Sequence, residues 1–179
     1  MCIRDSDYKV RNSTPPADGD WKVLGWDAAG IVREVGPDVT QFELGDEVYY
    51  AGSITRPGTN AEFHLVDARI VGHKPASLSW AEAAALPLTT LTAWEAMFDR
   101  LDVAKPVPGA AEAILIIGGA GGVGSIAVQI ARQRTDLTVI ATASRPETQE
   151  WVRGLGAHHV IDHSRPLAPQ IAELGIGAP

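Results

Sequence analysis

The chain has 179 residues, of which 45% are hydrophobic and 21% charged, and its formal net charge is −7. This composition is typical of a globular protein and excludes a disordered or fibrous chain. The acidic balance argues against nucleic acid or an anionic membrane surface as a partner, because both require a basic face. The first residues are rich in charge and lack the apolar core of a signal peptide, so the sequence indicates the cytoplasm.

The single cysteine, Cys2, leaves no internal disulfide and no cluster of thiolates for zinc. The longest uncharged run, residues 113–131, approaches the length of a membrane span, but it is interrupted by five glycines. We therefore expect no transmembrane segment.

Short strands separated by turns are expected in the first part of the chain. Residues 28–35 alternate in polarity, residues 47–50 are aromatic and β-branched, and residues 61–66 alternate again. Turn sequences at residues 36–38 and 44–46 separate the first two of these segments. The pattern predicts an antiparallel barrel or sandwich.

The segment from about residue 79 to residue 101 has the residue spacing of helices. Ser79 and Glu82 have the spacing of a capping box, which predicts a helix that ends at Pro87. Apolar residues at intervals of three and four then predict a second helix, and they would share one of its faces. These residues are Leu91, Trp94, Phe98 and Leu101.

Strands and helices alternate from residue 113 onward. Residues 113–117 are apolar without alternation, as in a strand that is buried on both faces of a parallel sheet. We expect a helix over 125–134, a strand over 137–142, a helix over 146–155 closed by Gly156, and a strand over 159–161. This order predicts a doubly wound α/β sheet.

A glycine-rich loop separates the first of these strands from the helix after it and fits the dinucleotide-binding pattern G-x-G-x-x-G. Gly119 would allow the tight turn, Gly121 the approach of a pyrophosphate, and Gly124 the close packing of helix on strand. The helix N-terminus would bind the phosphates, although such a loop can also merely turn the chain. The predicted cofactor-binding residues of the loop are Gly119, Ala120, Gly121, Gly122, Val123 and Gly124.

The end of the second strand of this sheet predicts which nucleotide is bound. An NAD site usually has an acid there, whereas this chain has Ala143, Ser144 and Arg145. Because a hydroxyl and a guanidinium can bind a 2′-phosphate that no carboxylate repels, NADPH is favoured over NADH. The alternative is that Ser144 caps the next helix, with Glu147 closing a capping box, while Arg145 is solvated; both interpretations can hold together.

Several segments resemble the medium-chain dehydrogenase/reductase superfamily: LGWDAAGIV at 24–32, GDEV at 45–48, and the glycine loop. Residues 50–62 and 86–94 resemble its zinc-free quinone oxidoreductase-like branch, whose members are often named zinc-type alcohol dehydrogenase-like. The resemblance implies an α/β chain with a partial GroES-like β-barrel followed by a partial Rossmann doubly wound parallel sheet.

The resemblance also implies domain boundaries. It places the barrel at 7–84, without its N-terminal part, and the NADPH-binding domain at 85–179, without its C-terminal part. Residues 1–6 have no counterpart in the family and read as a foreign prefix. Since half the sheet would be absent, we expect the isolated chain to aggregate.

The implied activity is hydride transfer from NADPH to an activated, small-molecule electrophile such as a quinone or an α,β-unsaturated carbonyl. Zinc-dependent relatives have Gly-His-Glu where this chain has Gly25, Trp26 and Asp27, and they use four cysteines for structural zinc, so no zinc is expected in this region. The alternatives are a non-catalytic NADPH-binding protein and an inactive fragment. The full-length parent is expected to be a homodimer.

No catalytic residue is assigned. By resemblance Thr92 would lie near the nicotinamide, with helix capping as the alternative. Tyr49, Tyr50 and Arg56 would line the substrate cleft, although a tyrosine on a strand often serves packing alone.

The five histidines are not expected to bind metal or to act in catalysis. Three of them flank the last predicted strand and are expected to be solvated or hydrogen-bonded, and the other two are expected to be surface or capping residues. In that order they are His158, His159, His163, His64 and His73.

Overall fold

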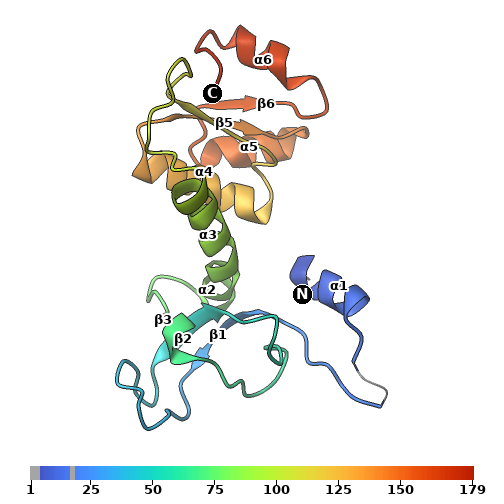
Figure 1. Cartoon of the computed structure of the whole chain (residues 1–179), viewed down its shortest axis with the longest axis vertical. Coiled ribbons are helices and arrows are strands. Elements are labelled where there is room, and N and C mark those ends of the chain that lie inside the picture. The colour runs from blue at the N-terminus through green and yellow to red at the C-terminus, as the bar shows by residue number, and fades with distance from the viewer. Residues whose placement is uncertain (1–4, 17–18) are drawn as a thin grey trace. The chain divides into compact units, whose positions relative to one another are not determined.

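The structure is a computed structural model that describes residues 5–16 and 19–179. The chain divides into two compact units, Met1–Leu88 and Thr89–Pro179, each of which is described by itself (Figure 1). Cys2 and residues 1–4 of the expected prefix lie outside the described residues. Among the helices that the structure describes, none is long and apolar enough to cross a membrane.

The first unit contains a three-stranded antiparallel sheet in the order β1-β2-β3. The register places Ala29 opposite Tyr49, and Tyr49 opposite Gly72. The side chains of Trp26, Phe42, Val48, Tyr50 and Ala83 form the buried apolar part of this unit. Its elements are α1 (Asp5–Ser13), β1 (Asp27–Ile31), β2 (Glu47–Ala51), a 3-10 helix (Ala68–Ile70), β3 (Gly72–His73) and α2 (Trp80–Ala85).

Two strand predictions for this unit are wrong in extent or in kind. The strand expected over 28–35 ends at Ile31, because after Val32 exchanges backbone bonds with Gly45 and Asp46 the chain leaves its partner. Residues 61–66 form no strand. They are held instead through the side chain of His64, and two apolar residues of the alternating pattern, Phe63 and Leu65, are exposed.

The capping box at the start of α2 is confirmed. The Ser79 hydroxyl accepts a hydrogen bond from the Glu82 N–H, and the Glu82 carboxylate accepts one from the Ser79 N–H. Pro87 then opens α3 (Pro87–Trp94), where its missing N–H is harmless.

A π-helical segment, Glu95–Arg100, continues α3. The apolar stripe predicted on this helix does lie along one side, and the rings of Trp94 and Phe98 are in contact at 4.6 Å. That side is nevertheless largely exposed, and the core is formed by the smaller side chains of Ala93 and Met97.

The second unit has the expected alternation of strands and helices. Its three strands are parallel in the order β4-β5-β6, with α4 and α5 along one side of the sheet and α6 beyond β6 (Figure 1). The core cluster forms where α4 and α5 meet β5, and its fully buried side chains include Val128, Val139 and Val152. The elements are β4 (Ala113–Ile116), α4 (Gly122–Arg134), β5 (Thr138–Thr142), α5 (Pro146–Gly154), β6 (His159–Ile161) and α6 (Leu167–Glu173).

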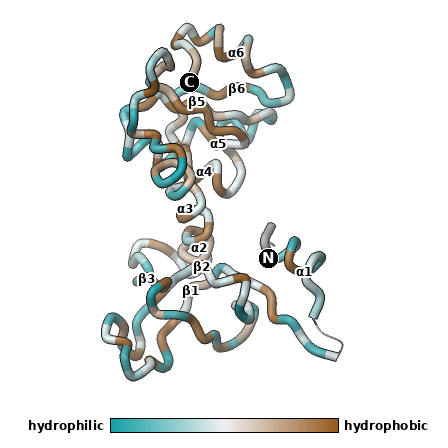
Figure 2. Tube along the Cα trace, in the orientation of Figure 1, coloured by the Kyte–Doolittle hydropathy of each residue, from teal (hydrophilic) through white to brown (hydrophobic). Residues whose placement is uncertain are grey.

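Hydropathy is distributed differently in the two units. Figure 2 shows hydrophobic stretches in the strands of the second unit and also along irregular segments of the first. In the first unit several of these apolar residues are exposed, including Leu44, Ile54, Phe63 and Leu65. Both units thus expose some apolar residues, and the second unit combines them with a buried core around β5.

Candidate functional site

The glycine loop lies at the carboxyl end of β4 and is fixed to the end of β5. The N–H of Gly118 donates to the Thr142 hydroxyl at 2.8 Å, and the N–H of Gly119 donates to the Thr142 carbonyl at 2.9 Å. Gly118, with φ of +68°, makes the left-handed turn that we had expected at Gly119. Gly119 must be glycine for another reason, because a Cβ there would lie 2.9 Å from the Cβ of Ala141.

The expected role of Gly124 in close packing is confirmed. Gly124 is buried, and a Cβ on it would collide with the carbonyl of Gly118. This contact holds the start of α4 directly against the turn that ends β4. No other residue could stand here without moving one of the two elements.

Helix α4 begins at Gly122, three residues earlier than predicted, with Gly121 as its N-cap. Starting a helix on Gly122 and Gly124 is unfavourable by propensity alone, which is why the sequence placed the start later. The early start leaves the N–H groups of Gly122 and Val123, two exposed residues, without an acceptor in the helix, whereas the N–H of Gly121 donates to the Gly118 carbonyl at 2.9 Å. The loop is thus shaped to receive an anion.

Ser144 and Arg145 follow β5 at the same edge of the sheet. The Ser144 capping interpretation is wrong, because Arg145 is the N-cap of α5 and Thr148 takes the place expected for Glu147. The Thr148 hydroxyl accepts from the Arg145 N–H at 3.3 Å and donates to its carbonyl at 2.8 Å. Among the described residues, the Ser144 hydroxyl has no hydrogen-bond partner in the protein.

The Arg145 guanidinium is paired with the carboxylate of Glu147 rather than only solvated. Its Nε lies 3.2 Å from Oε1 of Glu147, and the two side chains are 72% and 68% exposed. An ion pair this exposed contributes little stability, so the guanidinium can exchange this partner for another anion. The opposite charges of Arg145 and Glu147, two positions apart at the start of α5, were the signal that could have revealed the pair.

Two of the three histidines near β6, His158 and His163, are hydrogen-bonded, as predicted. Nδ1 of His158 accepts from the Val139 N–H at 2.8 Å, and Nδ1 of His163 lies 3.2 Å from the Thr142 hydroxyl. Burial, Arg132 and His159 together lower the pKa of His158, so its neutral form is favoured. The His158 side chain thus bonds to β5 near its beginning, and the His163 side chain bonds to β5 at its last residue.

In the first unit, Tyr50 and His64 form a defined pair. The Tyr50 hydroxyl lies 2.8 Å from Nδ1 of His64, and Nε2 of His64 lies 3.0 Å from the Pro57 carbonyl. Since a carbonyl can only accept, Nε2 carries the proton and Nδ1 accepts from Tyr50. Burial raises the pKa of the Tyr50 hydroxyl, which keeps it a donor. His64 is therefore not the simple surface or capping residue that we expected.

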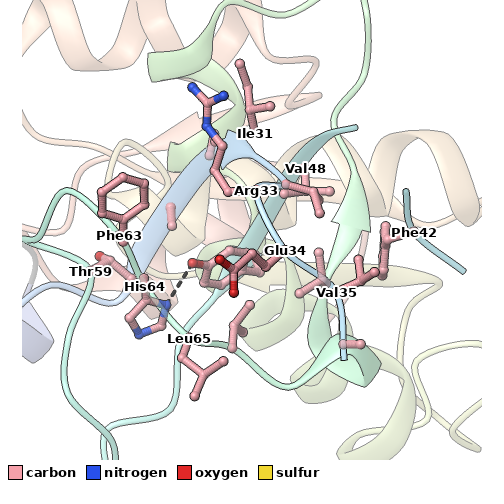
Figure 3. Close-up of a pocket in the computed structure, with 18 of the residues that line it drawn as sticks. Ile31, Arg33, Glu34, Val35, Phe42, Val48, Thr59, Phe63, His64 and Leu65 are labelled. Atoms are coloured by element: carbon pink, nitrogen blue, oxygen red, sulfur yellow. Dashed lines mark hydrogen bonds between the residues drawn. The ribbon is translucent and has the colours of Figure 1, made fainter. Parts of the chain in front are cut away.

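This pair lines a large pocket of about 1030 Å³ in the first unit (Figure 3). Its wall is mostly apolar, and Arg33 and Glu34 bring charge to it. Arg56 lines a separate cavity of about 200 Å³, which shares His64 with the first.

Tyr49 points to the other face of β2, where its ring approaches Gly72. The structure thus does not bring Tyr49, Tyr50 and Arg56 into one cavity.

Thr92 lies exposed within α3 rather than before a helix, so the capping alternative for it is wrong.

The position expected for a zinc ligand is occupied by Trp26. This side chain is 1% exposed, and its indole N–H donates to the Ser53 carbonyl at 2.9 Å. Across residues 5–16 and 19–179, no three histidine, cysteine, aspartate or glutamate side chains lie close enough together to hold a metal ion. The described residues do not fit a zinc site.

Comparison with known proteins supports the family resemblance that the sequence motifs indicate. The family profile of the alcohol dehydrogenase GroES-like domain matches residues 1–94. A zinc-type alcohol dehydrogenase-like protein of Staphylococcus aureus (strain COL) is 50% identical over 154 residues, which cover 86% of this chain and 46% of that protein. The chain therefore spans about half the length of the curated relatives it matches.

Solved structures agree with this assignment. A crystal structure from Rhizobium etli CFN 42, provisionally described as a zinc-dependent alcohol dehydrogenase, is 80% identical with a TM-score of 0.95, over 99% of this chain and 52% of that one. The Escherichia coli quinone oxidoreductase complexed with NADPH is 28% identical with a TM-score of 0.76, over 97% of this chain and 51% of that one. From the glycine loop, the two units and these matches, the chain belongs to the medium-chain dehydrogenase/reductase superfamily.

Proposed function

We propose that the protein to which this chain belongs binds NADPH at the glycine loop and reduces an activated acceptor, a quinone or an α,β-unsaturated carbonyl. The observation that carries the proposal is the pairing of an open helix N-terminus at Gly122 and Val123 with a serine and an arginine, rather than an acid, after β5. An NADPH complex of a quinone oxidoreductase with the same fold supports it.

The residues of the second unit have separable roles in this proposal. The N–H groups at the start of α4 bind the pyrophosphate, and Gly124 holds that helix end against the turn. Arg145 and the Ser144 hydroxyl bind the 2′-phosphate, for which Arg145 leaves its exposed partner Glu147. When bound, NADPH supplies the hydride.

The acceptor class follows from the chemistry that the described residues lack. Since they do not fit a zinc site, polarisation of a simple carbonyl has no metal to rely on, and an acceptor that is already electrophilic is favoured. Thr92 is proposed to lie near the nicotinamide, and Tyr50 and Arg56 are proposed substrate contacts. We further propose a cytoplasmic homodimer for the whole protein.

Binding and turnover of the full-length protein test the proposal. Arg145→Ala should weaken NADPH binding by about ten- to a hundredfold, because a charged hydrogen bond to phosphate is lost, and should leave NADH nearly unchanged. Arg134→Ala, at the opposite end of α4, is the matched control. Equal losses for the two nucleotides would contradict the assignment of Arg145.

Oxidation of NADPH in the presence of quinones, enals and simple aldehydes then tests the reaction. Turnover with quinones or enals and not with simple aldehydes is expected. Binding without oxidation of any of them would instead favour a non-catalytic NADPH-binding protein.

A further inference from the structure

Trp151 of α5 and Ser125 of α4 connect their helices to the glycine loop. The indole Nε1 of Trp151 lies 3.0 Å from the Ser125 hydroxyl, and that hydroxyl lies 3.3 Å from the carbonyl of Gly119. Trp151 is 26 residues from Ser125 in the sequence and Ser125 is six residues from Gly119, and the three belong to three segments of the second unit. They form one continuous chain of hydrogen bonds that ends on the loop.

The chemistry of the groups fixes the direction of both bonds. An indole nitrogen can only donate and a backbone carbonyl can only accept. Ser125 must therefore accept from Trp151 and give its single proton to Gly119. Loss of either side chain leaves the Gly119 carbonyl with a weaker partner or with none from this chain.

The Gly119 carbonyl matters because it sets the orientation of the next N–H group. The C=O and N–H of a trans peptide point in opposite directions, and no peptide of the described chain is cis. With the carbonyl directed at Ser125 on α4, the N–H of Ala120 is directed away from Ser125. The hydrogen-bond chain thus determines how the loop presents a donor.

Burial in the core does not explain why residue 151 is a tryptophan. Its side chain is 56% exposed, and the residue that anchors α5 in the core is its neighbour Val152, which contacts the place where a Gly119 Cβ would stand. The specific interaction of the Trp151 ring is its N–H bond to Ser125. That bond acts on the loop and not on the core.

We propose that Trp151 and Ser125 are positioning residues that hold the Gly119–Ala120 peptide in the orientation required to bind the pyrophosphate of the dinucleotide. This inference rests on the proposed function, since it deepens the same site. It requires that removing the hydrogen-bond chain weakens ligands with a pyrophosphate and spares ligands without one.

The test compares two ligands in the full-length protein. NADP+ contains both the pyrophosphate and the 2′-phosphate, whereas adenosine 2′-monophosphate lacks the pyrophosphate. Trp151→Phe, which keeps an aromatic ring without the N–H, and Ser125→Ala should each weaken NADP+ by about three- to tenfold, the loss of one neutral hydrogen bond. Binding of adenosine 2′-monophosphate should stay unchanged, and Ser125→Thr, which keeps the hydroxyl, should restore NADP+ binding.

The two residues should also be coupled. Because each variant breaks the same chain, the double variant should lose no more NADP+ affinity than the stronger single variant. Trp21→Phe, at a tryptophan that is exposed in the first unit, is the control for loss of an indole. Fluorescence of Trp151, obtained by difference from Trp151→Phe, should change on binding of NADP+ and not of adenosine 2′-monophosphate.

The outcomes separate this inference from the proposed function. Equal weakening of both ligands, or of neither, would overturn the positioning role and leave Trp151 and Ser125 as a structural link between α4 and α5. Failure of the unsubstituted protein to bind NADP+ would overturn the proposed function, and this inference with it. Because the ratio of the two affinities is measured on one sample, partial unfolding of a variant does not alter the result.

Discussion

The carboxylate of Glu147 lies 3.2 Å from the Nε of Arg145, the residue proposed to bind the 2′-phosphate. The two groups stand on the first turn of α5, at positions where both are exposed to solvent. A phosphate that binds Arg145 must displace this carboxylate or approach beside it. If Arg145 binds the 2′-phosphate as proposed, the pair lowers the affinity for NADPH below what Arg145 alone would give.

Glu147→Gln should strengthen binding of NADPH by about two- to fivefold, because an exposed ion pair of less than about 1 kcal/mol no longer competes and a repulsive charge is removed. NADH affinity should change little. The measurement is fluorescence titration with both nucleotides at low ionic strength, where surface charges are least screened. Weaker NADPH binding in this variant would show that Glu147 helps to hold Arg145 in place.

Gly124→Ala should disrupt the contact between α4 and the Gly118 carbonyl. We expect a loss of about 1–3 kcal/mol in the free energy of unfolding, as for overpacking elsewhere, together with a loss of nucleotide binding. Gly154→Ala is the matched control, since nothing lies within 4 Å of a Cβ there. By helix propensity that control should be neutral or slightly stabilising in urea unfolding. Similar losses for the two variants would contradict the close packing at Gly124.

Tyr50→Phe should destabilise the first unit by about 1 kcal/mol, because Nδ1 of His64 loses its donor. Tyr49→Phe is the control on the same strand, since among the described residues the Tyr49 hydroxyl has no hydrogen-bond partner. It should change stability by less than about 0.5 kcal/mol. Thermal unfolding measures the loss of stability in each variant. Equal losses for Tyr50→Phe and Tyr49→Phe would argue against a stabilising hydrogen bond between Tyr50 and His64.

The pH dependence of stability should reflect His158. Its pKa is lowered in the folded protein relative to the ordinary value of 6.5, so the unfolded chain takes up the proton first as the pH falls. The stabilising contribution is thus complete above about pH 6.5 and is lost as the pH falls through the lower, folded-state pKa. Protonation of Nδ1 would also break its bond to the Val139 N–H.

His158→Asn keeps an acceptor near that N–H but cannot take up a proton. Urea unfolding at pH values of about 7.5 and about 5.5 should show a smaller decrease in stability for this variant than for the unsubstituted protein. His73→Asn, at an exposed histidine of the first unit, controls for the loss of one imidazole. An unchanged pH dependence in His158→Asn would assign the effect to other groups.

The second unit could be predicted from the sequence because its signals are local. The uninterrupted apolar run of β4 and the glycine motif both depend on neighbouring residues, and the structure follows them to within a few positions. The beginning of α4 was placed late because helix propensity counts glycine as unfavourable, whereas here the contact of Gly124 with Gly118 decides.

The first unit was harder to predict because its strands depend on partners that are distant in sequence. Residues 61–66 alternate as a strand would, yet a strand needs a neighbour for its backbone bonds, and the segment is held by the side chain of His64 instead. The side-chain pairs Trp151 with Ser125 and Glu147 with Arg145 were missed for a related reason. Only the folded chain brings these side chains together.

Thr142 gives the glycine loop a property that matters for binding kinetics. Its hydroxyl and carbonyl accept from two successive N–H groups of the loop, and its hydroxyl is also bonded to His163 beyond β6. The loop conformation is therefore formed when the second unit folds. Little conformational entropy remains to be lost when an anion arrives, so association at this loop should need no slow rearrangement of the backbone.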